Sequence, residues 1–172
     1  MADGTGDPGA AGYQTTVQAL YGVAYAIRFA LKHGDDALEY PVMPLQGLWW
    51  AADGREVIAI DRSSWLWTMM ILQPPQATEE LVEQATAKVR RTKPAAAVDG
   101  VRLERLAEGR CAQVLHTGPY REEPPTIDRL LAFVQANGCV VAGRHHEIYL
   151  SDPSRTAPEK LRTIIRYPVA AA

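Results

Sequence analysis

Hydrophobic and polar positions in the second half of the chain follow two different periods. A strand-like run with a two-residue period covers Val101–His116, with Glu108-Gly109 as a candidate break into a hairpin. Apolar residues at helical spacing follow Pro124-Pro125. Two further strand-like runs cover Val140–Ser151 and Arg162–Val169. The pattern predicts the order strand, helix, strand, strand.

The first half repeats most of this order. A long, mostly apolar helix is predicted over Thr16–Lys32, and strands are predicted over Tyr40–Ala51 and Ser64–Gln73. A helix over Thr78–Arg91, with one apolar face, joins the two halves. The chain therefore reads as two copies of one unit.

The opening turn of the first copy follows no predicted strand. Residues 4–8 correspond to the turn at 116–119, which does follow one. We therefore predict that the first strand has been lost or that another segment or subunit takes its place. An unpaired sheet edge favours a homodimer that covers it, and a monomer is the alternative. We expect one domain over residues 1–172, with a first module at 1–75, a linking helix at 76–98 and a second module at 99–172.

Composition narrows the class of protein. A chain of 172 residues can bury a sizeable core. Its 18 basic and 20 acidic residues form no long run of either sign, which argues against direct nucleic-acid binding. No apolar run reaches the roughly 18 residues that span a membrane, and the N-terminus lacks a signal-peptide pattern. Cys111 and Cys139 are expected as reduced thiols, with a disulfide left open, so we expect a cytoplasmic protein.

One acid and four tryptophans stand out in the strand-like runs. Glu147 lies inside the run at 140–151, where a buried carboxylate is costly unless it is paired or used. A solvated glutamate on an open sheet face is the alternative. The side chains that alternation groups on one side of a strand are Trp65, Trp67, Met69 and Ile71 in one run, and His145, Glu147 and Tyr149 in another. We predict that these two sets form facing walls of an aromatic pocket, with core packing as the alternative for each tryptophan.

Five segments carry a family pattern: Leu20–Tyr25, Pro44–Trp50, Trp65–Pro74, His116–Pro125 and His145–Pro153. They resemble the GyrI-like small-molecule-binding proteins, which are close to the effector-binding domains of multidrug-responsive transcription regulators. The match is to the stand-alone branch without a DNA-binding domain. This resemblance implies an α+β fold of two strand-helix-strand-strand modules related by a pseudo-twofold axis. It also implies an antiparallel sheet with helices on one face and a ligand cleft between the modules.

The resemblance also implies a function. The regulators bind bulky, flat, often cationic drugs around a central glutamate, which Glu147 matches. Gln46 stands where relatives usually have a glutamate, so a second acid there is lost. Stand-alone members have been associated with the hydrolytic opening of reactive cyclopropanes in DNA-alkylating natural products. The expected ligand is therefore an aromatic or cationic, drug-like small molecule.

For hydrolysis, Glu147 is the expected general base for water, with its pKa raised by burial. Tyr25 or Tyr120 is the candidate to stabilise the developing phenolate. The other expected ligand-binding residues are Trp49, Trp65, Trp67, Met69, His116, His145 and Tyr149. A non-catalytic binding, sequestering or sensor module, in which Glu147 is only a counter-charge, is the alternative function.

No metal or cofactor is expected. His145 and His146 are adjacent in a predicted strand, so their side chains point to opposite faces and cannot easily bind one ion together.

Overall fold

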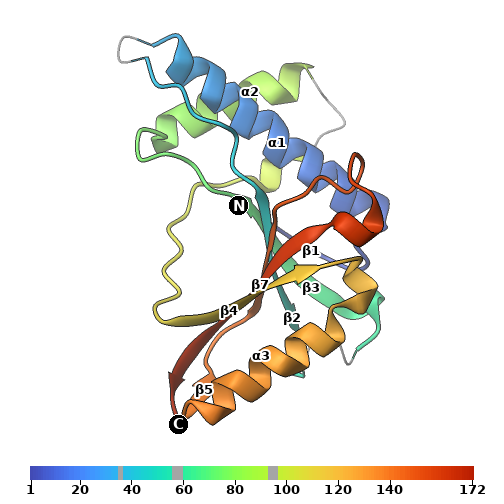
Figure 1. Ribbon diagram of the computed structural model, residues 1–172. Coiled ribbons are helices and arrows are strands. Elements are labelled where there is room, and N and C mark those ends of the chain that lie inside the picture. The colour runs from blue at the N-terminus through green and yellow to red at the C-terminus, as the bar shows by residue number, and fades with distance from the viewer. Residues whose placement is uncertain (35–36, 56–59, 93–96) are drawn as a thin grey trace.

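The computed structural model describes residues 1–34, 37–55, 60–92 and 97–172 (Figure 1). Its strands are β1 (Ala2–Thr5), β2 (Leu45–Ala51), β3 (Trp65–Ile71), β4 (Cys111–Thr117), β5 (Cys139–Val141), β6 (His145–Tyr149) and β7 (Arg162–Ala171). Its helices are α1 (Ala11–Lys32), α2 (Glu79–Thr92) and α3 (Pro124–Ala136). Single 3₁₀ turns occur at η2 (Arg62–Ser64), η3 (Val98–Gly100), η4 (Tyr120–Glu122) and η5 (Pro158–Lys160).

The strands form one antiparallel sheet in the order β1-β3-β2-β6-β7-β4, and β5 pairs with the end of β7. This order is symmetric, because β1-α1-β2-β3 and β4-α3-β6-β7 occupy equivalent positions on either side of the β2–β6 contact. The predicted α+β fold of two strand-helix-strand-strand modules related by a pseudo-twofold axis is therefore confirmed. Figure 1 shows α1 and α2 at one end of the sheet and α3 at the other.

One row of residues across the sheet shows which face the helices cover. The row consists of Ala2, Met69, Gly47, Glu147, Ile165 and Val114, each opposite the next on a neighbouring strand. Met69 packs in one core with Leu20 of α1, and Ile165 packs in another with Ile127 of α3. Because opposite residues of antiparallel strands share a face, α1 and α3 cover the same face. Glu147 lies between them, where the modules meet.

Helix α2 lies on the outer side of α1 rather than on the sheet. Val82, Ala85 and Val89 of α2 pack against Ala19 and Val23 of α1. The predicted linking helix is thus present as α2, while residues 93–96 of the predicted segment 76–98 lie outside the described residues. None of the helices in the described ranges has the length and apolar character needed to cross a membrane.

The first strand, which the sequence pattern predicted to be missing, is present. Ala2–Thr5 pairs antiparallel with β3, with Gly4 opposite Trp67. A short segment containing Asp3 and Gly4 has little intrinsic strand preference, so pairing with β3 decides its conformation. Gly4 is required there because a Cβ atom would lie 2.1 Å from the Trp67 ring. The edge that we predicted to be exposed at β3 is therefore covered by the chain itself.

Other predicted strands are shorter than their apolar patterns. The strand predicted over Tyr40–Ala51 begins only at Leu45, and the one predicted over Ser64–Gln73 covers Trp65–Ile71. Residues 101–110 precede β4 without a strand partner, so β4 begins only at Cys111. The run at 140–151 forms two strands, β5 and β6, because their shared partner β7 contains Pro168, which has no N–H to donate. The Pro168 carbonyl instead accepts from Ala142 N–H at 2.8 Å.

Candidate functional site

The predicted site residues on strands all face the helices. The register places Trp67, Trp49 and His145 opposite one another in one row, and Met69, Gly47 and Glu147 in the next. The two sets of side chains predicted as facing walls are therefore neighbours on a single face, because β3, β2 and β6 are adjacent in one sheet. The wall opposite them is made by the helices and the turns before them.

Glu147 is a largely buried carboxylate whose first partner is His145. The His145 ring donates from Nε2 to Glu147 Oε1 at 2.8 Å. The His145 side chain is 3% exposed to solvent and the Glu147 side chain is 14% exposed. The Tyr167 hydroxyl lies 2.7 Å from His145 Nδ1. The two ring nitrogens of His145 are thus hydrogen-bonded on opposite sides of the ring, to Glu147 and to Tyr167, which fixes the ring orientation.

A second chain of hydrogen bonds reaches Glu147 from β2. The Trp49 indole N–H donates to the Tyr149 hydroxyl at 3.0 Å, and that hydroxyl donates to Glu147. Burial raises the pKa of Tyr149 well above its usual value, and the charge of Glu147 raises it further. Tyr149 therefore stays protonated as a donor to the carboxylate.

The pKa of Glu147 shifts in the direction opposite to our expectation. Burial alone would raise this pKa, but hydrogen bonds from His145, Tyr149 and Glu123 hold it below the ordinary value. The raised pKa belongs to Glu123, which precedes α3. Burial and the nearby charge of Glu147 raise the pKa of Glu123 to about 9. Glu123 directly precedes α3, where acids are common, so nothing in the sequence distinguished it as a site residue.

Aromatic rings surround this group of acids. Tyr13 of α1 stacks on Trp49 with ring centroids 6.0 Å apart and meets Trp67 edge-on at 5.3 Å. Tyr120 of η4 meets Tyr149 edge-on at 5.8 Å. Burial, then the charge of Glu147, raises the pKa of Tyr13, and the same two causes raise that of Tyr120 to about 12.

Tyr13 was absent from the predicted site because the first helix was expected to begin at Thr16. The helix begins at Ala11, which places Tyr13 two turns before Leu20 on the face toward the sheet. An earlier helix start was the one signal that could have identified it.

The other residues predicted to bind ligand differ in how deeply they are buried. Trp67 and Met69 are fully buried in the core, a position that favours packing over ligand contact. His116 is also buried, with its ring nitrogens bonded to Thr126 and to the Pro119 carbonyl at 3.1 and 3.3 Å. Trp65 is half-buried against the edge of Trp49.

Tyr25 does not join the group around Glu147. It is 48% exposed on α1 and its ring contact is with Tyr21. Both tyrosines line an open cavity of about 550 Å³ between α1 and α2, which also contains Phe29 and Lys88. Of the two candidate tyrosines, Tyr120 is the one that the fold brings close to Glu147.

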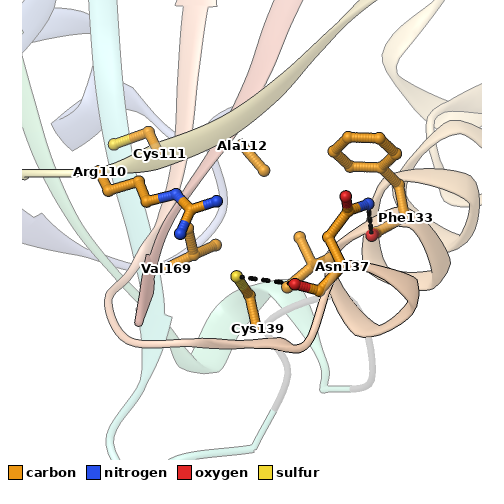
Figure 2. A pocket seen from close by; sticks show the side chains of 8 residues that line it. Arg110, Cys111, Ala112, Phe133, Asn137, Cys139 and Val169 are labelled. Carbon is orange, nitrogen blue, oxygen red and sulfur yellow. Dashed lines mark hydrogen bonds between the residues drawn. The ribbon is translucent and has the colours of Figure 1, made fainter. Parts of the chain in front are cut away.

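A smaller cavity of about 90 Å³ lies near the other end of the sheet. Figure 2 shows Arg110, Cys111 and Cys139 around it, with the Cys139 thiol directed to the Asn137 carbonyl at 3.5 Å. Both cysteines are free thiols. Glu147 lines neither this cavity nor the one between α1 and α2.

The GyrI-like small-molecule-binding domain family matches residues 2–170, and the chain belongs to this family. A crystal structure of an uncharacterised conserved protein from Listeria innocua is 40% identical, with a TM-score of 0.90. A crystal structure of a hydrolase from the same organism is 39% identical, with a TM-score of 0.85. Each alignment covers 98% of this chain and 85% of the other.

A more distant match shows the fold alone. The C-terminal domain of EcmrR is 10% identical with a TM-score of 0.52, and the alignment covers 91% of this chain and 82% of that one. No curated protein matches the chain. Within the described ranges, no group of three or more His, Cys, Asp or Glu side chains is arranged to hold a metal ion.

Proposed function

We propose that the protein binds bulky, flat aromatic molecules beside Glu147 and hydrolyses those that carry an activated cyclopropane. The observation that carries this proposal is an ionised, largely buried carboxylate among aromatic rings, at the junction of two modules. Tyr13 and Tyr120, both half-buried, supply flat apolar surface, and a cationic ligand gains about 0.5–2 kcal/mol over such rings. The 39% identity to a hydrolase favours a reaction with water.

The reaction requires a base near the water and a hydrogen-bond donor near the carbonyl oxygen that becomes a phenolate. Glu147 removes a proton from water as the water oxygen bonds to a cyclopropane carbon. The strained C–C bond breaks, and its electron pair moves through the conjugated ring to the carbonyl oxygen, which becomes a phenolate. A hydroxyl that remains protonated stabilises this charge, and Tyr120 fits this role better than the exposed Tyr25.

The pKa of Glu147 favours a second function, binding without catalysis. A carboxylate that three donors hold below its ordinary pKa is a weak base but a permanent negative charge. In this alternative Glu147 anchors cationic ligands, and the protein sequesters or senses them.

The test is to incubate the protein with a spirocyclopropyl-dienone alkylator and to follow loss of the dienone absorbance, with mass spectrometry to confirm addition of water. Glu147→Gln should reduce turnover by at least about 100-fold, as expected for loss of a general base, while a neutral aromatic ligand still binds. Glu122→Gln is the matched control, because Glu122 is an exposed neighbour of Glu123 that forms an ion pair with the exposed Arg121. Saturable binding without turnover in the wild type would reject the hydrolase and leave the binding module.

A further inference from the structure

Glu123 and Glu147 are two carboxyl groups in direct contact within one buried site. Glu123 reaches the site from the start of α3 and is 5% exposed, and Glu147 reaches it from β6. The two side chains interact directly, and the charge of Glu147 raises the pKa of Glu123. Since two like charges this close within a buried site are costly, one of the two carboxyl groups carries a proton.

The surroundings place the proton on Glu123. Glu147 already accepts from His145 and Tyr149, which stabilise its charged form. Glu123 has the Thr163 hydroxyl as its other hydrogen-bond partner, and its Oε1 atom is buried without any partner. A neutral carboxylic acid is therefore the stable form of Glu123 in the free protein, and the pair carries one negative charge.

The pair has no lysine or arginine beside it. In the part of the chain that the structure describes, no residue of either type forms an ion pair with either carboxyl group. The titratable groups that face it are Tyr13 from α1, Tyr120 from η4, and His145 and Tyr149 from β6, with Tyr167 of β7 behind His145. His145 is the basic group among them, and it already pairs with Glu147. A second negative charge, on Glu123, is thus balanced by a cationic ligand.

We infer that Glu123 couples the charge of the ligand to a proton: binding of an aromatic cation releases the proton of the Glu123–Glu147 pair, and binding of a neutral ligand retains it. Glu123 is then a specificity-determining residue, because the site adjusts its charge from −1 to −2 to match the ligand. This inference rests on the proposed binding of aromatic ligands beside Glu147. It does not depend on catalysis.

The size of the effect follows from the nearby charge. A cation in contact with a buried carboxyl lowers the pKa of that carboxyl by about 1–3 units. From a starting pKa of about 9 for Glu123, cation binding at pH 8 should release about 0.4–0.9 protons. Affinity for the cation should rise at least about fivefold between pH 6 and pH 9, because protons compete with the ligand.

Isothermal titration calorimetry at pH 8, in two buffers of different ionisation enthalpy, measures this release. The probes are N-methylacridinium, a flat cation that does not titrate, and N-methylacridone, its neutral counterpart. We expect buffer-dependent heats for the cation and equal heats for the neutral compound. Glu123→Gln should bind both probes with equal heats in the two buffers, and Glu122→Gln should match the wild type.

Three other results would overturn the inference, and the experiment distinguishes them. Equal heats for the wild type with both probes bound would show that no proton is released, and the binding site itself would stand. Proton release that persists in Glu123→Gln would assign the proton to another group. Failure of both probes to bind would remove the proposed ligand site together with the inference.

Discussion

Two glycines keep the aromatic rings of the site in place. Gly4 lies against the Trp67 ring, and a Cβ atom on Gly47 would lie 2.8 Å from Trp49 Nε1 and 3.0 Å from Met69 Sδ. Gly47 is directly opposite Glu147, so the absence of a side chain there leaves room for the Trp49 ring. From that position Trp49 donates to Tyr149, which in turn donates to Glu147. These two glycines are thus part of the site, because they leave room for the aromatic rings.

Gly4→Ala should destabilise the protein by about 1–3 kcal/mol, because the added methyl group overlaps the buried Trp67 ring. Urea denaturation measures the loss. Gly12→Ala is the control, since a Cβ atom there meets nothing within 4 Å and alanine favours helix α1. If both variants have wild-type stability, the close packing of β1 on Trp67 is wrong.

At the scale of elements, the charge of Glu108 attaches the end of the segment 101–110 to the far face of the sheet. Glu108 contacts the buried His146 ring through Nδ1 at 2.9 Å and the Arg166 guanidinium at 3.2 Å. Gln46 contacts the other nitrogen of His146 at 3.0 Å. Burial lowers the pKa of His146, against the opposing effect of Glu108. The two adjacent histidines therefore serve different faces, as strand alternation predicted.

Glu108→Gln should cost about 1–3 kcal/mol of stability, because Arg166 loses its charged partner at a largely buried position. Tryptic cleavage within 101–110 should become faster, while ligand affinity should not change, since Glu147 lies on the opposite face. Glu104→Gln, which removes an exposed pair with Arg102, should stay within about 0.5 kcal/mol of the wild type. Weakened ligand binding in Glu108→Gln would contradict this separation of the two faces.

For the whole molecule, the buried proton of Glu123 links stability to pH. The pKa of Glu123 is about 9 in the folded protein against an ordinary 4.5. The stabilisation from this proton is fully present below pH about 4.5 and is lost as pH rises toward 9. Glu147 has a lowered pKa, so its contribution is lost only at pH below its ordinary value of 4.5.

Between pH 5 and pH 8 the wild type should therefore lose stability relative to Glu123→Gln, by at most about 1.4 kcal/mol per pH unit. Urea denaturation of both proteins at pH 5, 6.5 and 8 measures the difference, with Glu122→Gln as the control. Parallel pH profiles of the wild type and Glu123→Gln would show that Glu123 is not protonated in the folded protein.

Periodicity along the chain determined most elements and the repeated order of strand, helix, strand, strand, because apolar faces at periods of 2 and 3.6 residues are local properties. It also identified Glu147, since a lone acid in an apolar run is visible without a structure. The short strand β1 could not be found this way, because its pairing with β3 depends on residues more than 60 positions away.

The composition of the site depended on tertiary contacts. Trp67 and Glu147 lie on one face of the sheet because β2 pairs with both of their strands. Alternation within each strand cannot reveal this pairing. Glu123 and Tyr13 join the site only through the packing of the starts of α3 and α1 over the sheet. The proton of Glu123 has the same origin, since a pKa depends on burial and on neighbouring charges that folding brings together. Local pattern thus specified the elements, and long-range packing specified the chemistry between them.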